Sequence, residues 1–134
     1  MRSRIPAIPI LFVFLALLTN ILSAHGQPSD GIWTTYTTAN GLGLNRTRDV
    51  NADPRGGVWV GTYGGGVSHF NGATWKTYNI SNSGLESNDI ISVAVDHNNV
   101  VWFGAGDAHV TSYDGTSWRI HWDSPTRIHN IVVD

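Results

Sequence analysis

The feature that most constrains this chain is an internal repeat, in which one segment returns later with its glycines and tryptophans in place. The segment "GGVWVGTYGGGVSHFNGATW" covers residues 56–75, and "NVVWFGAGDAHVTSYDGTSW" covers residues 99–118. A shift of 43 residues aligns the two copies, without a gap from Gly41 to Asn79. The repeat predicts copies of one supersecondary unit that stack on each other and bury a shared core.

Two partial copies flank this repeat. "WTTY" at Trp33 matches "WKTY" at Trp75, and the final "HNIVVD" resembles the earlier "ISVAVD". A period of 40 to 50 residues marked by tryptophan and glycine is typical of β-propeller blades rather than of helical solenoids. No stretch after residue 26 has the apolar periodicity of an amphipathic helix. We therefore predict an all-β chain.

Each period contains four short runs rich in Val, Ile, Thr and aromatic residues, separated by clusters of Gly, Asn and Asp. Runs of this kind predict β-strands. "FNG" and "YDG" predict tight turns between the third and fourth strands, because Asn-Gly and Asp-Gly reach positive φ angles readily. The strands expected in the two periods cover residues 46–52, 58–62, 67–70 and 75–78, then 90–95, 100–105, 109–113 and 118–122.

These strands predict a partial β-propeller of about two and a half four-stranded antiparallel blades within residues 27–134. The full blades cover about 45–79 and 88–122, residues 32–37 form the fourth strand of another blade, and residues 128–133 form the first strand of the next. Propellers close into a ring of about four to eight blades, which two blades cannot do. We therefore expect a fragment of a longer protein, a truncated gene product, or copies that assemble into one ring. The missing blades or other copies of the chain are then its partners.

The first 26 residues have the layout of a secretory signal peptide. Arg2 and Arg4 precede an apolar run, and small residues, Ala24 and Gly26, follow it. This layout predicts export, to the periplasm or the extracellular space, with cleavage after Gly26. An uncleaved membrane anchor is the alternative, although the apolar run is shorter than the roughly 20 residues that a spanning helix needs. The chain has no cysteine, which excludes disulfides and cysteine-based metal sites.

Charge narrows the possible partners. Six of the eight basic side chains and all ten acidic ones lie after residue 26, so this part carries a net charge of about −4. Nucleic-acid binding depends on clustered Lys and Arg, and the sequence contains no such cluster. We therefore exclude nucleic acid as a partner.

The stretch "LGLNRTRDVNADPRGGVWVGTYGGGVSHFN", residues 42–71, resembles the two-component regulator propeller repeat. That repeat carries a Leu, an Asn, an Asp-x-x-Gly turn, Trp-Ile-Gly-Thr, a glycine cluster, a small apolar residue and an aromatic. The matching positions, in order, are Leu42, Asn45, Asp53, Gly56, Trp59, Val60, Gly61, Thr62, Gly65, Val67 and Phe70. The second copy departs from the repeat where it carries Asn99, Ala105, Asp107, Ala108 and His109.

The resemblance covers essentially the whole chain after residue 26 and implies a function as well as a fold. Such repeats form the exported sensor region of bacterial hybrid histidine kinases, so a histidine kinase module is the implied partner if the chain belongs to a longer protein. The repeat itself is structural. It therefore indicates the fold more specifically than the ligand.

Long loops point to one end of the blades as the ligand face. The second–third loops and the inter-blade links "TANGLGLN", "ISNSGLESN" and "DSPTR" share that end, and binding residues concentrate on such loops. Trp122, which has no tryptophan counterpart in the other copy, is the candidate for stacking on a sugar. The other candidate ligand-binding residues are Arg46, Tyr63, Asp89, Asp107, His109 and Arg127.

These candidates also have structural interpretations. Arg46 and Asp89 could simply begin strands in solvent, and Tyr63 could pack on the neighbouring blade. Residues that recur in both copies have structural roles in the repeat, and the recurrent tryptophans are expected to fill the space between blades. The recurrent residues are Trp59, Trp75, Trp102, Trp118, Gly61, Gly104, Asp53 and Asp96.

The sequence contains no constellation typical of an enzyme. The histidines after the leader lie at scattered positions without metal-ligand spacing, and no Gly-x-Ser-x-Gly motif is present. We therefore expect no catalytic residue, no metal and no other cofactor, and a binding module for an unknown small ligand, with an oligosaccharide as one candidate. Two alternatives stay open. One is a protein–protein scaffold, and the other is an enzyme similar to the streptogramin lyases, which would use Glu86 and His109.

Overall fold

The computed structural model of the chain describes residues 33–123 and 127–134, with only the backbone of Trp122 and Asp123. The expected signal peptide, residues 1–26, lies outside the described residues. The elements lie in one compact unit, Thr35–Asp134. No helix in the described ranges has the length and apolar composition that crossing a membrane requires.

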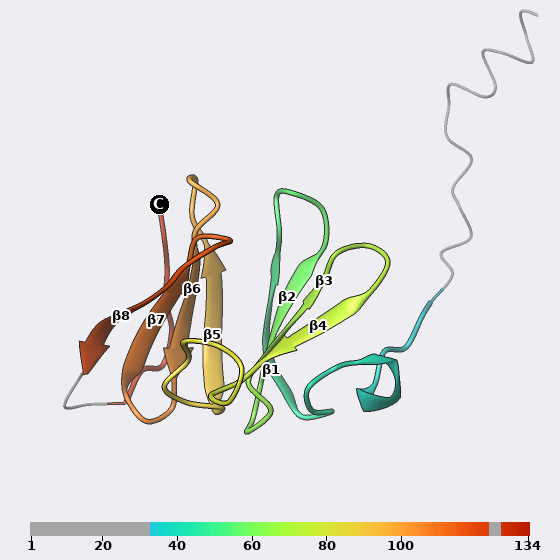
Figure 1. The fold of residues 1–134 in the computed structure, drawn as a ribbon, viewed down its shortest axis with the longest axis horizontal. Coiled ribbons are helices and arrows are strands. Elements are labelled where there is room, and N and C mark those ends of the chain that lie inside the picture. Colours follow the sequence, from blue (N-terminus) through green and yellow to red (C-terminus); the bar gives the residue numbers. More distant parts are fainter. Residues whose placement is uncertain (1–32, 124–126) are drawn as a thin grey trace, which may run out of the picture. The chain divides into compact units, whose positions relative to one another are not determined.

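This unit contains two four-stranded antiparallel sheets (Figure 1), as the sequence predicted. Each sheet runs up and down, so that consecutive strands are neighbours in the order of the chain. The first sheet consists of β1 (Thr47–Ala52), β2 (Val58–Thr62), β3 (Val67–Phe70) and β4 (Trp75–Tyr78). The second sheet consists of β5 (Ile90–Val95), β6 (Val101–Ala105), β7 (His109–Tyr113) and β8 (Trp118–Asp123). A short 3-10 helix, η1 (Thr38–Asn40), precedes β1.

An aspartate organises the turn between the first and second strands of each sheet. Asp53 Oδ1 accepts a 2.9 Å hydrogen bond from the backbone N–H of Arg55, and Asp96 Oδ1 accepts one of 2.8 Å from Asn98. Gly56 adopts a φ of 95° in the first turn, and Asn99 adopts 61° at the same place in the second. Asparagine tolerates this left-handed region better than most residues, so the second turn keeps its shape without glycine.

The core lies between the two sheets and is largely aromatic. Trp59 is 1% exposed and stacks on Tyr78 of its own sheet, while its edge meets Phe103 of the second sheet at a centroid distance of 5.7 Å. From the other side, Trp118 contacts Tyr78 at 5.3 Å. Trp59 and Trp118 therefore fill the space between the sheets, as expected from the repeat.

The other two recurrent tryptophans lie on the outer faces of the sheets, so their expected position between blades stays a prediction. Trp75 packs against Phe70 and Tyr36, at centroid distances of 5.0 Å and 5.3 Å. Trp102 packs against His121 of its own sheet at 4.5 Å. Each of these two rings faces away from the core, toward a side where the described residues supply no further sheet.

The recurrent glycines allow close approach between neighbouring layers. A Cβ atom on Gly61 would lie 2.9 Å from the Ile90 Cγ2 atom of the second sheet. A Cβ atom on Gly104 would lie 2.7 Å from Ile128 Cγ2 and 3.1 Å from Ile131 Cδ1. The C-terminal segment therefore packs on the second sheet much as β5 packs on the first.

Side-chain hydrogen bonds also join each sheet to the segment that packs on it. Asp49 Oδ2 accepts a 2.8 Å hydrogen bond from Val93 N, and Ser92 Oγ accepts one of 3.0 Å from Ile131 N. Ser92 follows Asp49 by the repeat length of 43 residues. The segment 128–133 thus occupies the position that a first strand would take beside the second sheet.

Two expected strands are nevertheless absent, and those predictions were wrong for the described residues. Residues 33–37 and 128–133 have no strand assignment, while residue 32 lies outside the described part. A strand is defined by backbone hydrogen bonds to a neighbour, and the described ranges provide no such neighbour for either segment. Sequence pattern alone could not reveal this lack of pairing partners.

Candidate functional site

The up-and-down topology gives the sheets two ends with different properties. The loop end carries the β2–β3 and β6–β7 loops and the 79–89 link, and it is the end where the sequence places ligand binding. The turn end carries the tight turns that precede β2, β4, β6 and β8. Both ends bring polar and aromatic side chains together.

At the loop end, two arginines lie against one tyrosine ring. The guanidinium carbons of Arg46 and Arg48 lie 4.3 Å and 4.4 Å from the centroid of Tyr63, which is 38% exposed. A 2.9 Å hydrogen bond from Tyr63 N to Arg46 O fixes the two backbones beside each other. Guanidinium groups at this distance are attracted to the face of an aromatic ring.

Asp89 joins this cluster from the start of the second sheet. Its backbone pairs with that of Tyr63, and its Oδ1 atom lies 3.8 Å from Arg48 Nη2. Within the described ranges, Asp89 Oδ1 accepts no hydrogen bond, although little of that atom is exposed to solvent. The structure therefore brings Arg46, Tyr63 and Asp89 together as candidates, and it adds Arg48, which the sequence reasoning missed.

Arg127 reaches the same region through the backbone of Gly106. Arg127 Nε donates a 3.2 Å hydrogen bond to Gly106 O, and Gly106 N donates one of 2.9 Å to Asp89 O. A side-chain Cβ on Gly106 would lie 2.6 Å from Asp89 Oδ2. The small residue thus leaves room for the carboxylate.

Asp107 and His109 form a pair on the β6–β7 loop. His109 Nδ1 lies 3.0 Å from Asp107 Oδ1. Burial favours a higher pKa for Asp107, but the hydrogen bonds from His109 and Ser87 and the charge of His109 together outweigh it, so the pKa is lowered. The backbone of Trp122 pairs with Val110, whereas its side chain lies outside the described part, so its role in sugar stacking stays a prediction.

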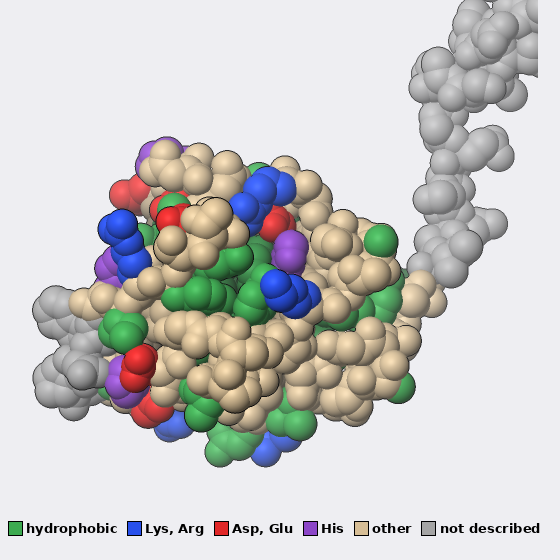
Figure 2. All heavy atoms as spheres, viewed as in Figure 1, with side chains coloured by type: hydrophobic (Ala, Val, Ile, Leu, Met, Phe, Trp, Pro, Cys, Tyr) green, Lys and Arg blue, Asp and Glu red, His purple; other side chains and the backbone are tan. Residues whose placement is uncertain are grey.

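At the turn end, a cavity of about 320 Å³ opens between the two sheets. Figure 2 shows hydrophobic side chains gathered in this hollow, with basic, acidic and histidine side chains around them. The cavity is lined by Asp53, Arg55, Gly56, Trp59, His69, Asn71, Tyr78, Tyr113 and Gly115. We call it the inter-sheet hollow.

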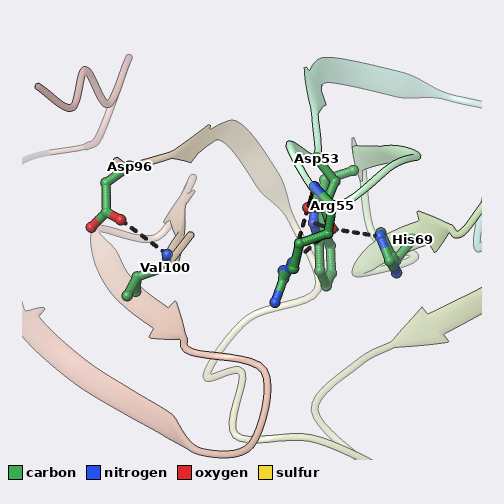
Figure 3. A network of polar contacts seen from close by, with 6 residues as sticks. Asp53, Arg55, His69, Asp96 and Val100 are labelled. Carbon is green, nitrogen blue, oxygen red and sulfur yellow. Dashed lines mark hydrogen bonds and ion pairs between the residues drawn. The ribbon is translucent and has the colours of Figure 1, made fainter. Parts of the chain in front are cut away.

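A polar network centred on Asp53 forms one wall of the inter-sheet hollow (Figure 3). Arg55 donates to Asp53 through Nε at 3.0 Å and through Nη2 at 3.2 Å, and His69 Nε2 lies 2.9 Å from Asp53 Oδ2. Trp59 Nε1 donates a further 3.2 Å hydrogen bond to the same carboxylate. The Asp53 side chain is 1% exposed, so these donors replace its water shell.

This environment shifts two pKa values. Burial alone would raise the pKa of Asp53, but the hydrogen bonds and positive charge of Arg55 outweigh it, and the pKa is lowered. Burial lowers the pKa of His69, although the Asp53 carboxylate opposes that shift. The network therefore contains a carboxylate and an imidazole that is neutral at pH 7.

The second sheet contains only part of this network. Trp102 Nε1 donates to Asp96 Oδ2 at 3.0 Å, which matches the Asp53–Trp59 pair. At the positions that correspond to Arg55 and His69, the second sheet carries Asn98 and Ser112. The sequence reasoning assigned Asp53 a structural role and overlooked Arg55 and His69. Their departure from the repeat is the signal that could have identified them.

The described residues offer no metal centre. Within 33–123 and 127–134, no three His, Asp or Glu side chains come together closely enough to hold a metal ion.

Comparisons with known proteins connect the chain to two-component signalling. No protein-family model matches the chain. Histidine kinase P4 of Formosa agariphila is 36% identical over 69 residues, which are 52% of this chain and 5% of that protein. The extracellular domain of a hybrid two component system of B. thetaiotaomicron has a TM-score of 0.61 at 22% identity, over 75% of this chain and 14% of that one. The chain thus spans a small part of both proteins.

The two comparisons support different statements. The solved structure supports the all-β fold. It supports nothing beyond the fold, because its sequence identity to this chain is only 22%. The sequence match relates about half of this chain to a histidine kinase. A sensor role and membership of the specific repeat family both belong to the proposal below.

Proposed function

We propose that this chain is part of an exported β-propeller sensor of the two-component regulator propeller type, and that its loop end binds a small ligand. The cluster of Arg46, Arg48, Tyr63 and Asp89 is the single observation that carries this proposal. The sensor acts by binding and contains no catalytic residue. Its partner in signalling is a histidine kinase module, as the similarity to a histidine kinase and to an extracellular sensor domain supports.

The fold does not require the cluster, as the internal repeat indicates. At the positions that correspond to Arg46, Arg48 and Tyr63, the second sheet carries Asp89, Ile91 and Gly106. Both sheets nevertheless form with the same strand order. Residues that break a structural repeat at exposed loops are the natural candidates for binding.

The chemistry of the cluster suits a hydroxylated ligand. The partly exposed Tyr63 ring offers a flat apolar surface, and the two guanidinium groups beside it offer several N–H donors in fixed planes. Asp89 adds a carboxylate whose Oδ1 atom lies 3.8 Å from Arg48 Nη2 and helps to hold that guanidinium in place. A sugar ring presents one apolar face together with donors and acceptors at its rim, so an oligosaccharide is the ligand class to test first.

A glycan array probed with the full chain tests this proposal. We expect the wild type to bind a defined set of oligosaccharides and the Tyr63→Ala variant to lose about 0.5–1.5 kcal/mol of binding free energy, the range for contacts between aromatic rings. Ile80→Ala is the matched control, because Ile80 is an exposed apolar residue in the link at the same end. Binding that both variants retain fully would contradict the proposed site.

A second candidate function, a protein–protein scaffold, is favoured by the outer face of the first sheet. Val50 is 57% exposed there, and together with Phe70 and Trp75 it lines an apolar groove of about 280 Å³. The equivalent residues of the second sheet, Tyr113 and Trp118, pack against the first sheet. Another blade, from a longer chain or from a second copy, is therefore the occupant that this face fits.

Light scattering of the purified chain tests the scaffold function. A concentration-dependent oligomer that Trp75→Ala disrupts would support it, and a monomer at all concentrations would contradict self-assembly.

A further inference from the structure

We propose that the inter-sheet hollow at the turn end is a second binding site, which takes a small ring compound carrying one carboxylate group. This site is separate from the loop-end cluster of the proposed function. It lies at the opposite end of the strands and uses none of the same residues.

The first argument is that the fold does not need the residues that give the hollow its chemistry. The Asp–Trp hydrogen bond is present in both sheets, and so is the hydrogen bond from a backbone N–H of the turn to the aspartate Oδ1. Arg55 and His69 are additions to this common plan, since Asn98 and Ser112 serve at the corresponding positions of the second sheet. A charged and an imidazole side chain thus lie beside a cavity, whereas the second sheet forms the same turn with neither of them.

The second argument is the shape of the hollow and its aromatic wall. Tyr78 of the first sheet and Tyr113 of the second lie 5.7 Å apart between ring centroids, and His69 stacks on Trp59 at 4.1 Å. The cavity of about 320 Å³ is at the lower limit of small-molecule sites, which start near 300 Å³. A space of this size admits one ring rather than a chain of several sugars.

The third argument is the balance of donors and acceptors. The two carboxylates near the hollow are already engaged: Asp53 accepts from Arg55 and Trp59, and Asp114 accepts from Thr116 and Ser117 in its own turn. Arg55 and Asn71 line the hollow, and the hydrogen bonds of their side chains use Arg55 Nε and Nη2 and Asn71 Oδ1, which leaves the donors Arg55 Nη1 and Asn71 Nδ2 for a ligand. A ligand must therefore supply acceptors, and a carboxylate is the acceptor that a guanidinium binds most strongly.

Electrostatics favours the same ligand. Lys76 Nζ lies 4.8 Å from the centroid of Tyr78, which lines the hollow, and so brings a second cation to its edge. Arg55 itself has a side chain that is 43% exposed although it binds Asp53, so its outer face reaches solvent. The hollow thus combines an aromatic wall, two N–H donors and a neighbouring ammonium group.

Cyclic carboxylates come from two chemical sources, sugar acids and aromatic acids, and titration calorimetry of the full chain separates them. The probes are glucuronate and benzoate, with glucose as the uncharged control. We expect at least one of the two carboxylates to bind and glucose to bind at least about tenfold more weakly, since a charged hydrogen bond is lost. Binding of glucuronate alone identifies a sugar-acid site, and binding of benzoate alone identifies an aromatic-acid site.

The Arg55→Asn variant tests the assignment to this site, because it copies the residue that the second sheet carries and should therefore fold. We expect it to weaken carboxylate binding at least about tenfold. Arg119→Asn, which removes an exposed cation from β8, should leave that binding unchanged. The proposal is overturned if neither carboxylate binds, if glucose binds as well as glucuronate, or if Arg119→Asn has the same effect as Arg55→Asn.

Discussion

The indole Nε1 of Trp59 donates a 3.2 Å hydrogen bond to the buried carboxylate of Asp53, and this bond ties the first turn of the sheet to its second strand. The same relation joins Trp102 to Asp96 at 3.0 Å in the second sheet. The recurrent aspartate and tryptophan of the sequence are thus hydrogen-bond partners that stabilise the same turn in each sheet. In the first sheet alone, Arg55 and His69 approach this carboxylate as well.

The Asp53→Ala variant should be destabilised more than the Asp96→Ala variant. Asp53 is 1% exposed and accepts hydrogen bonds from Arg55 and Trp59, so its removal leaves these donors unpaired, at a cost of about 1–3 kcal/mol. Asp96 is less buried, so the Asp96→Ala variant should lose less. Urea unfolding followed by tryptophan fluorescence measures both free energies of unfolding. Equal losses in the two variants would contradict the special role of the first turn.

The two equivalent tryptophans should respond differently to truncation. Trp59 is 1% exposed between the sheets, so Trp59→Ala should cost about 3–5 kcal/mol of the free energy of unfolding. Trp102 lies on an outer face and remains partly exposed, so Trp102→Ala should cost clearly less. Thermal unfolding monitored by circular dichroism compares the two variants. A larger loss for Trp102→Ala would mean that its face is covered in solution.

Gly66 should tolerate no side chain, whereas Gly64 in the same loop should tolerate one moderately. Gly66 has a φ of 79°, and a Cβ atom there would collide with the carbonyl oxygen of Tyr78. Gly64 has a φ of 95° with open space around the Cβ position. We expect Gly64→Ala to lose about 1–2 kcal/mol through its left-handed backbone, and Gly66→Ala to lose more or fail to fold. Chemical denaturation of both variants is the measurement, and similar stabilities would argue against the observed β3–β4 contact.

Acidification should destabilise the folded chain through His69. Burial lowers the pKa of His69, so the unfolded state takes up a proton first as the pH falls below about 6.5. Stability that is fully present above that pH is therefore lost as the pH falls toward the folded-state pKa. Melting temperatures between pH 7.5 and pH 5 should decline in the wild type and decline less in His69→Ser. The control is His129→Ser at an exposed position, and an equal effect of both variants would refute the assignment to His69.

A bulky residue at position 104 should release the C-terminal segment. Gly104 contacts Ile128 and Ile131 closely, so Gly104→Val would force these side chains away from the second sheet. We expect faster hydrogen exchange of the Ile131 amide, because its hydrogen bond to Ser92 Oγ would be lost. Exchange measured by mass spectrometry on the peptide 127–134 checks this. Unchanged protection would show that the segment is held by other contacts.

Most of the strands could be predicted from the sequence because their signals are local. Alternation of β-branched and aromatic residues, together with Asn-Gly and Asp-Gly turns, placed β2–β5 and β7 at their observed bounds and the other strands within one residue. The strands expected at 32–37 and 128–133 carry the same local signals. They failed within the described residues because pairing needs a neighbour, and a local pattern contains no information about whether a neighbour is present.

The candidate sites were also predicted only in part from the sequence. The sequence pointed to Arg46, Tyr63 and Asp89, because they occupy loops at one end, but it did not show that Arg48 shares their cluster. It did not reveal the inter-sheet hollow, whose lining comes from both sheets and from turns that are far apart in the chain.

By itself the sequence determined the unit of this fold: a repeat of 43 residues, its hairpin turns and the residues that recur at its contacts. The tertiary structure decided which recurrent tryptophans are buried, where Arg55 and His69 meet Asp53, and which faces and edges lack a neighbour among residues 33–123 and 127–134. The physical reason is the distance along the chain over which each effect acts. Turn geometry and strand propensity depend on adjacent residues. Burial, pKa shifts and cavities arise instead only when two sheets approach each other.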